Sequence, residues 1–378
     1  MHSTFTKTTC TNRFLSQIQS TTKITSPYLS QTRTNMTSVS SLPTSMRAAQ
    51  WTSNTGGLER NLRVNSEAKL PKDANALPKD SILVRVAYSS LNPVDYKLPE
   101  LPLLGNFLFS KPATPGLDFS GKVVSSQVPH LKPGEPVFGK VELPNFGALS
   151  EYVVVGKQGV AKIPNGVSAK DAACVGVTGL TAFQCIVPFV KPGDKILING
   201  GSGGTGTFGI QLAKAAGCHV TATCSGANVE LCKSLGADEV IDYRTQSVVD
   251  TLKRSGTRFD HIVDNVFADP NLYWQSEHYL KPDGQYVTIA GEAKLTTISA
   301  FLKIFLIPTF LGGGKRKFQM ITCASNTEQY NQIAKWMGEG KVKVVIEQEL
   351  DLSEVGKGYE RLKSGRTRGK VVIKVSDS

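Results

Sequence analysis

A glycine-rich loop between an apolar strand and a helix constrains the fold of this chain more than any other feature. Gly201, Gly203 and Gly206 form a GxGxxG pattern after the apolar run Lys195–Asn199 and before a helix expected over Thr207–Ala216. Such glycines permit a tight turn, a close approach of the backbone to a pyrophosphate, and close helix–strand packing. The free N–H groups at the helix N-terminus also attract phosphate. The pattern predicts a bound dinucleotide that contacts Gly201, Ser202, Gly203, Gly204, Thr205 and Gly206.

Strands and helices alternate around this loop. A helix is expected over Asn228–Leu235, and after Lys195–Asn199 strands are expected at His219–Thr223, Glu239–Ile241, His261–Val263 and Gln285–Ile289. Strand–helix alternation is typical of a parallel, doubly wound sheet with helices on its faces. We therefore assign residues 168–315 to a Rossmann dinucleotide-binding domain.

The segments on either side of this domain have a different pattern. Alternating apolar runs at Ile82–Val86, Gly121–Val124 and Glu151–Val155 lie between Pro- and Gly-rich turns, which is typical of short strands in a partly open β barrel. A helix over Thr327–Met337 and strands near Val344 and Val371 close the chain. A length of 378 residues exceeds one comfortable core. We expect residues 46–167 and 316–378 to lie outside the Rossmann domain, either as a separate domain or as one domain into which the Rossmann domain is inserted.

Residues 1–45 have the composition of an appendage. They are rich in Ser and Thr, and no acid precedes Glu59, whereas the bases Lys7, Arg13, Lys23 and Arg33 are present. This composition is typical of a mitochondrial or plastid presequence. The alternatives are a disordered tail, or upstream sequence bypassed by a start at Met36 or Met46. We expect an organelle, the mitochondrion in particular, and otherwise a cytoplasmic location.

Several classes of protein are disfavoured by composition. The seven cysteines include no CxxC pair, so a disulfide framework or zinc finger is not expected. The longest apolar stretch, Ile298–Leu311, contains Lys303 and Pro308 and is shorter than the ~20 residues of a bilayer span. The net charge of +12 invites a nucleic-acid partner, yet no basic run is interleaved with aromatic residues. We therefore expect no nucleic-acid binding.

The end of the second Rossmann strand indicates the type of cofactor. An NAD site places an acid about 20 residues after the glycine loop to hold the ribose 2′-hydroxyl. Here Thr223–Asn228 contains no acid, and Lys233 or Arg244 could provide a cation. We therefore predict NADPH. Its expected contacts at this end are Ser225, Asn228 and Tyr243, although Tyr243 could instead be a surface aromatic that caps the sheet edge.

Seven sequence motifs follow one another between Met46 and Val375. They are Leu91–Lys97, Thr114–Gly121, Leu131–Gly139, Gly147–Tyr152, Val177–Ala182, the glycine loop and Ser234–Tyr243. This order resembles the medium-chain dehydrogenase/reductase superfamily, and within it the zinc-independent quinone oxidoreductases related to zeta-crystallin. It is also similar to chloroplast-envelope quinone oxidoreductase homologues and to mitochondrial reticulon-interacting NADPH oxidoreductases. The resemblance implies a GroES-like catalytic domain interrupted by a Rossmann domain.

The resemblance also allows a test for zinc. Zinc-dependent alcohol dehydrogenases of the superfamily have a Cys at the position of Asn92 and Gly-His-Glu at Gly116–Asp118. Neither ligand is present, and no cysteine lies between Ser120 and Glu151 to form a structural zinc site. We therefore expect no metal. The remaining chemistry is hydride transfer from NADPH to a quinone or an α,β-unsaturated carbonyl of small, hydrophobic character.

The resemblance assigns roles to individual residues. Asn92 and Asp95 line the nicotinamide end, and Tyr96 and Lys97 are expected donors to a developing enolate or hydroquinone oxygen. We count Asn92, Tyr96 and Lys97 as catalytic. The alternatives are a simple Asn-Pro turn, a core tyrosine and a solvated lysine. Further expected contacts of the nicotinamide half are Thr178, Thr181, Asn265, Ile289 and Ala290, the last three of which could be ordinary strand-end turn residues.

Other readings stay open. The family often has a Tyr where this chain has Ala113, so solvent could supply the proton. The same fold serves trans-acting enoyl reductases of polyketide or acyl thioesters, and a non-catalytic NADPH-binding scaffold is a third alternative. The apolar segment Phe301–Phe310 could wall the acceptor pocket, join the subunits of a homodimer or touch a membrane surface beside the basic run Lys315–Lys317. Of these, we favour the pocket or the dimer.

Overall fold

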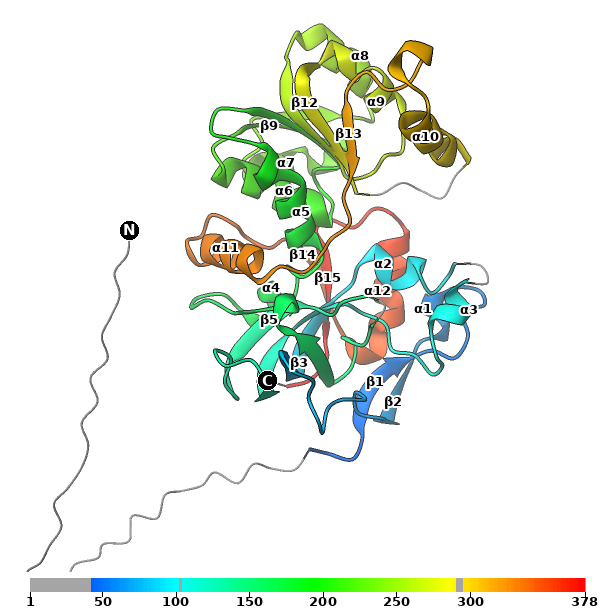
Figure 1. Ribbon diagram of the computed structural model, residues 1–378, viewed down its shortest axis with the longest axis vertical. Coiled ribbons are helices and arrows are strands. Elements are labelled where there is room, and N and C mark those ends of the chain that lie inside the picture. Colours follow the sequence, from blue (N-terminus) through cyan, green and yellow to red (C-terminus); the bar gives the residue numbers. More distant parts are fainter. Residues whose placement is uncertain (1–41, 102–103, 144, 290–294, 378) are drawn as a thin grey trace, which may run out of the picture. The chain divides into compact units, whose positions relative to one another are not determined.

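The computed structural model describes residues 42–101, 104–143, 145–289 and 295–377 (Figure 1). Residues 1–41 of the expected leader lie outside the described residues, and so does the expected cofactor contact Ala290. Within the described ranges, no helix has both the length and the apolar character needed to cross a bilayer.

A parallel six-stranded sheet confirms the predicted Rossmann fold. Its strand order is β10-β9-β8-β11-β12-β13, so the order reverses between β8 and β11. Ile196, Leu197 and Ile198 of β8 are all fully buried, as expected for a strand covered on both faces. The strands are β8 (Lys195–Asn199), β9 (His219–Cys224), β10 (Glu239–Asp242), β11 (Phe259–Asp264), β12 (Leu280–Thr288) and β13 (Lys317–Met320).

Helices connect these strands. The helix after the glycine loop begins at Gly204, earlier than the Thr207 expected, because the glycine backbone itself forms the first turn. Strand β13 pairs with β12, so this sheet continues beyond residue 315, where we placed the domain end. The helices are α6 (Gly204–Ala215), α7 (Val229–Ser234), α8 (Val248–Ser255), α9 (Asn271–Trp274) and α10 (Leu295–Leu306).

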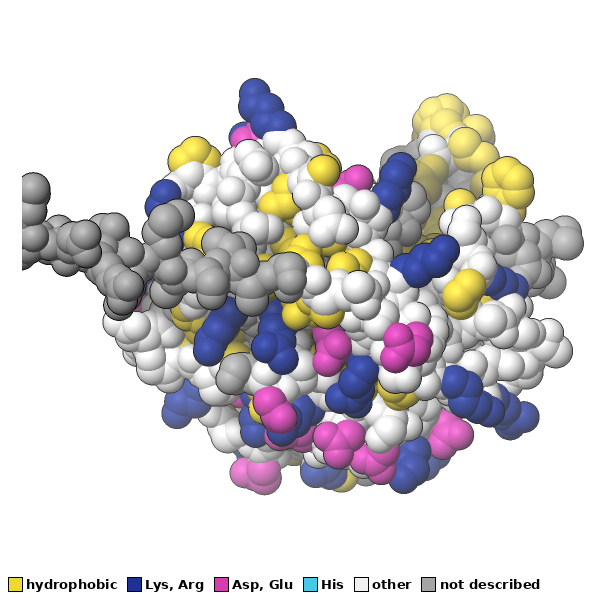
Figure 2. Space-filling model, turned by 90° about the horizontal axis from the view of Figure 1, so that it is seen from below, with side chains coloured by type: hydrophobic (Ala, Val, Ile, Leu, Met, Phe, Trp, Pro, Cys, Tyr) yellow, Lys and Arg dark blue, Asp and Glu magenta, His cyan; other side chains and the backbone are white. Residues whose placement is uncertain are grey.

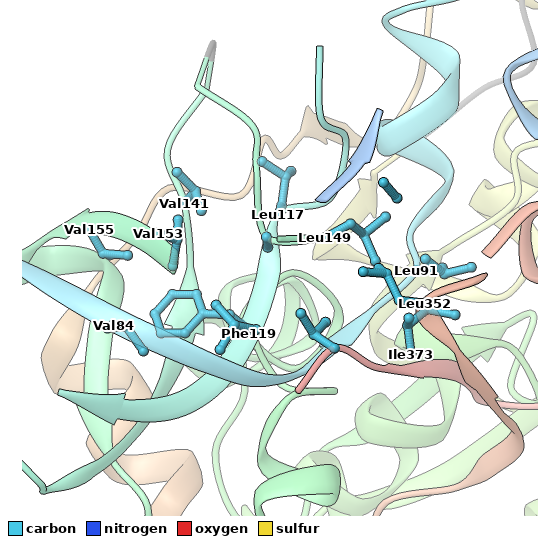
Figure 3. Packing of buried hydrophobic residues seen from close by; sticks show 14 of the residues in the cluster. Val84, Leu91, Leu117, Phe119, Val141, Leu149, Val153, Val155, Leu352 and Ile373 are labelled. Carbon is cyan, nitrogen blue, oxygen red and sulfur yellow. The ribbon is translucent and has the colours of Figure 1, made fainter. Parts of the chain in front are cut away.

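A second, mostly antiparallel sheet of seven strands forms the GroES-like part. The long strand β3 pairs with β4 along its length, with β6 over its first half and with β15 at its end. Figure 3 shows the apolar side chains that this sheet buries, among them Val84, Phe119 and Ile373. Its strands are β3 (Ser81–Ser90), β4 (Asp118–Ser126), β5 (Pro136–Lys140), β6 (Tyr152–Gly156), β7 (Val160–Lys162), β14 (Ile346–Asp351) and β15 (Lys370–Lys374).

Smaller elements complete this part of the molecule. A separate hairpin-like pair is formed by β1 (Met46–Gln50) and β2 (Arg63–Ala68). The helices are α1 (Leu58–Asn61), α2 (Pro93–Lys97), α3 (Leu104–Leu108), α4 (Ala169–Ala172), α5 (Thr178–Ile186), α11 (Thr327–Gly338) and α12 (Val355–Lys363).

The two sheets are joined through a shared core and through the backbone. One cluster of buried side chains combines Phe183 of α5, Phe208 of α6, Tyr330 of α11 and Val372 of β15, and Figure 1 draws α5 and α11 between the two sheets. At the glycine loop, the N–H of Gly369 donates to the carbonyl of Ser202 at 3.0 Å. The start of β15 is therefore bound directly to the loop that is expected to hold the cofactor.

Different structural constraints explain why glycine occupies different positions of the loop. Gly200, which precedes the predicted pattern, makes the tight turn with φ of +82°. A Cβ on Gly206 would lie 2.1 Å from the carbonyl oxygen of Gly200, so only glycine fits there. A Cβ on Gly203 would meet no atom closer than 3.7 Å. Gly206 thus serves packing within the fold, whereas Gly203 faces open space.

These positions predict opposite outcomes for two alanine variants. Gly206→Ala should lower the free energy of unfolding by ~1–3 kcal/mol, because overpacked backbone has no room to relax. Gly203→Ala should leave thermal stability near that of the unmodified protein and weaken cofactor binding instead. Thermal denaturation and equilibrium cofactor titration measure the two effects. Equal loss of stability in both variants would contradict the assignment.

Candidate functional site

A cleft of about 1550 Å³ opens at the carboxyl ends of β8, β9 and β10. Ligands of doubly wound sheets bind at this edge, where the strand order reverses. The glycine loop, the turn after β9 and the turn after β10 form one side of the cleft, and the loop before β15 contributes to the other. Lining residues include Asn199, Gly203, Ser225, Asn228, Tyr243, Arg244, Arg366 and Arg368.

Hydrogen bonds from the glycine loop to Thr223 of β9 hold the loop in place. The N–H of Gly201 donates to the carbonyl of Thr223 at 2.8 Å, and the N–H of Gly200 donates to its hydroxyl at 3.1 Å. That hydroxyl in turn donates to Oδ1 of Asn199 at 2.5 Å. Thr223 is fully buried, so these contacts are shielded from water. They fix the loop before any ligand arrives.

Two buried amide oxygens in this region lack a partner. Asn228 donates through Nδ2 to the hydroxyls of Ser202 and Ser225, both at 3.1 Å, but its Oδ1 has no hydrogen-bond partner among the described residues. The same holds for Oδ1 of Asn265, whose Nδ2 donates to the carbonyl of Asn199 at 3.1 Å. Buried polar atoms without partners are rare. With the open space at Gly203, they fit a dinucleotide whose hydroxyl or amide groups donate here.

Cations line the adenosine end of the cleft. Arg244 lies there as predicted, but Lys233 is not among the lining residues, and its ammonium is 3.2 Å from Glu230. Arg366 and Arg368 also line the cleft. Sequence reasoning missed these two arginines, because they belong to the loop before β15 and come close only through the fold. Together with Arg244 they bring three guanidinium groups to the cleft lining.

A carboxylate also lines this end of the cleft. Asp242, the last residue of β10, accepts hydrogen bonds from the backbone N–H of Arg244 at 3.0 Å and from the hydroxyl of Thr245 at 3.1 Å. A Cβ on Gly226 would lie 2.7 Å from its Oδ2. The acid that sequence reasoning sought after β9 is thus absent there, whereas another acid reaches the same surface from β10.

Beneath the glycine loop lies a buried ionic network. The Lys370 ammonium donates to Oδ1 of Asn92 at 2.6 Å and lies 3.5 Å from Oδ2 of Asp118. Asn92 completes the triangle, since its Nδ2 donates to Asp118 at 2.9 Å. All three side chains are at most 2% exposed. Both ends of the Asn92 amide are therefore engaged in hydrogen bonds within this network, and its catalytic role stays a prediction.

Asp118 connects this network to the start of α5. Its Oδ1 accepts from the N–H of Val177 at 2.7 Å, and its Oδ2 accepts from the hydroxyl of Ser90 at 2.8 Å. Thr178 and Thr181 follow on α5 and are buried, with the Thr178 hydroxyl donating to the carbonyl of Cys174 at 2.8 Å. A Cβ on Gly204 would lie 3.1 Å from Thr178 and 3.3 Å from Lys370. The predicted contacts Thr178 and Gly204 are thus neighbours.

Asp95 is buried completely at the start of α2. Its Oδ2 accepts from the N–H of Asn92 at 2.8 Å and from the Tyr359 hydroxyl at 3.4 Å, while Oδ1 has no partner among the described residues. Loss of solvation raises the pKa of Asp95 to about 8, and the negative charge of Asp118 adds to this effect. Through the hydrogen bond from the Asn92 N–H, the Asp95 carboxylate caps α2, the helix that carries the predicted donors.

The predicted donors Tyr96 and Lys97 are the last two residues of α2. Tyr96 is half-buried, with its ring edge-on to Tyr359 at 6.3 Å and with the Lys363 ammonium 5.0 Å from its centroid. Lys97 is exposed. Neither residue lines the cleft described above. Their catalytic role stays a prediction, and so do the roles of Tyr243, which is 52% exposed in the cleft, and Ile289.

Within the described part of the chain, no group of three or more His, Cys, Asp or Glu residues is arranged to hold a metal ion.

Two family models match the chain. Residues 78–165 match an alcohol dehydrogenase GroES-like domain, and residues 235–373 match a zinc-binding dehydrogenase domain. The solved quinone oxidoreductase of Coxiella burnetii is 28% identical and covers 88% of this chain and 99% of its own, with a TM-score of 0.74.

Alignments with known relatives cover most of the chain. The trans-enoyl reductase pgmF of Aspergillus terreus is 42% identical over 90% of this chain and 99% of its own length. The chloroplast envelope quinone oxidoreductase homolog of Arabidopsis thaliana is 31% identical, over 87% and 98%. The mitochondrial NAD(P)H oxidoreductase RTN4IP1 of Homo sapiens is 32% identical, over 78% and 82%.

The chain therefore belongs to the medium-chain dehydrogenase/reductase family, whose members bind NAD(P)H. It is an oxidoreductase, and its relatives include quinone oxidoreductase homologues and a trans-enoyl reductase.

Burial of Asp95 predicts a pH dependence of stability. The folded-state pKa near 8 exceeds the ordinary value of 3.8, so folding favours the protonated carboxyl. Its contribution is complete below about pH 4 and is lost as the pH rises through about 8. Asp95→Asn keeps an acceptor oxygen and cannot ionise, so its free energy of unfolding should fall less between pH 5 and pH 8. Urea denaturation at both pH values measures this change, and Asp283→Asn, which alters an exposed carboxylate, is the control. The same change in the free energy of unfolding in both variants would contradict the prediction.

Proposed function

We propose that this protein transfers a hydride from NADPH to an electrophilic double bond, in a quinone or an α,β-unsaturated carbonyl. The observation that carries the proposal is the cleft that combines the glycine loop with Arg244, Arg366 and Arg368. Polarised alkenes and quinones accept hydride without help from a metal, which agrees with the chemistry of the residues around Asn92. The small, hydrophobic substrate would enter beside α2 and α5.

The residues present would divide the work of binding and positioning. The loop glycines and the N-terminus of α6 would hold the pyrophosphate, while the arginines would hold the 2′-phosphate. The bound nicotinamide supplies a hydride from its C4. Lys370 fixes Asn92, and Asp95 fixes the start of α2, so Tyr96 and Lys97 are held on a short, capped helix. From there the phenol or the ammonium would stabilise and protonate the acceptor oxygen.

Cofactor preference tests the roles of the arginines. Arg366→Gln and Arg244→Gln should each weaken NADPH binding by about tenfold or more, because each loses a charge-assisted hydrogen bond to phosphate. NADH binding should change little. Lys233→Gln is the matched control, since Lys233 lies outside the cleft lining. Fluorescence titration measures all affinities. An unmodified protein that binds NADH at least as tightly as NADPH would refute the preference.

Turnover tests the chemistry. NADPH oxidation should be observed with a panel of quinones and enals, and Tyr96→Phe or Lys97→Ala should lower kcat by about 10²-fold if that residue is the general acid. Cofactor affinity should not change in these variants. Cofactor binding without turnover of any acceptor would instead support a non-catalytic scaffold.

A second candidate is reduction of enoyl thioesters in trans on a polyketide or fatty-acyl carrier. It is favoured by the 42% identity to a trans-enoyl reductase over nearly its whole length. Because the chemistry is the same, the acceptor decides between the two. Turnover of 2-enoyl thioesters with no turnover of small quinones would select this candidate.

We also propose that residues 1–45 direct the protein to an organelle. The proposal rests on their acid-free composition and on the chloroplast and mitochondrial relatives. A fluorescent reporter fused to residues 1–45 should enter mitochondria, and a diffuse signal would count against it.

A further inference from the structure

Helix α10 has an apolar side chain on almost every face. Ala300, Phe301 and Ile304 pack toward the interior beside β11 and β12, where the rings of Phe301 and Phe267 stack at 4.7 Å. The opposite face is also apolar, although it is exposed. Ser299 and Lys303 interrupt the outer face, but its other exposed side chains are large and apolar. No part of the described chain covers these side chains.

The outer face continues into the short turn that follows the helix. We define the apolar tip as six exposed residues of this region. Spacings of four, three and one place the first four on one helical face. The residues and their exposed fractions are Ile298 (48%), Leu302 (54%), Phe305 (56%), Leu306 (71%), Phe310 (85%) and Leu311 (66%). Contiguous exposed apolar patches mark contact sites.

The shape of the apolar tip limits what can cover it. Exposed fractions of 71% for Leu306 and 85% for Phe310 mean that these side chains project outward. None of the tip residues lines the dinucleotide cleft, so the tip does not form a wall of that part of the site. A projecting apolar group can enter a fluid hydrocarbon layer without a preformed groove, whereas a protein partner needs a matching cavity.

The sequence segment that contains the tip carries charges of one sign. On the face shown in Figure 2, Lys and Arg side chains are interspersed with Asp and Glu side chains. By contrast, residues 293–327 contain no Asp or Glu, and they contain five bases, namely Lys294, Lys303, Lys315, Arg316 and Lys317. Lys315 pairs with Glu277 at 2.9 Å, which neutralises one of these charges. The remaining excess would attract anionic phosphate headgroups.

This charge pattern argues against a second copy of the chain as the occupant. A twofold interface places the same surface on both partners, so it would bring together two patches of the same charge. The segment offers no acid to compensate them. An anionic lipid surface, in contrast, complements both the apolar residues and the bases.

We propose that the apolar tip inserts into the headgroup–acyl boundary of an anionic membrane and attaches the protein peripherally. The surrounding lysines and Arg316 would lie at the level of the lipid phosphates. This corresponds to the arrangement of interfacial helices, which lie in the membrane plane rather than cross it. The assignment is independent of the acceptor that the enzyme reduces.

Vesicle co-sedimentation of the full chain tests the proposal. The protein should bind vesicles of phosphatidylcholine mixed with phosphatidylglycerol, and bind pure phosphatidylcholine more weakly. Phe310→Ser should reduce binding by about tenfold, and Lys303→Gln by about fivefold, with less effect at high salt. Phe107→Ser is the matched control, because Phe107 is 88% exposed on α3. Comparison within the full chain cancels any contribution of residues 1–45.

A second readout reports insertion directly. Phe310→Trp should show a blue-shifted emission with anionic vesicles, while the cofactor affinity of each variant shows that it has folded. Equal binding of all variants, or equal loss in Phe107→Ser, would overturn the proposal. A dimer in solution that Phe310→Ser converts to a monomer would also overturn it, in favour of a second copy.

Discussion

The buried contact of Lys370 with Asn92 and Asp118 ties together elements from four places in the chain. It joins the N-cap of α2, the start of β4, the start of α5 and the start of β15. A buried ion pair is expensive to desolvate, and it survives only when further hydrogen bonds satisfy both charges. Here the carbonyl of Leu91 and the hydroxyl of Ser90 provide them. One polar cluster therefore fixes the residues beneath the glycine loop. Its hydrogen bonds are directional, whereas apolar packing is not.

The same cluster explains why residues from both the Rossmann part and the GroES-like part line the cleft. Lys370 is preceded by Gly369, whose N–H is bound to the glycine loop, and by Arg366 and Arg368 on the cleft surface. Residues 366–370 thus line the cleft, contact the glycine loop and bind Asn92 through Lys370. A displacement of this segment would therefore affect both the cleft lining and the position of Asn92.

The sequence predicted what depends on local pattern. The glycine loop and the alternating strands follow from spacing, and the structure confirms the Rossmann sheet beside a GroES-like part that the family resemblance implies. It could not predict contacts between segments far apart, such as the 278 residues that separate Asn92 from Lys370. Nor could it show that Asn92 and Asp95 are wholly buried, since burial depends on what the fold places over them. The turn glycine, Gly200, was missed because the motif template begins one residue later.

The bond between Gly369 and Ser202 also limits how the molecule can open. It is a backbone contact at the point where the two sheets meet, and it is part of a parallel bridge between Gly203 and Gly369. Any motion that widens the cleft and preserves this contact has to be a rotation about an axis that passes close to it.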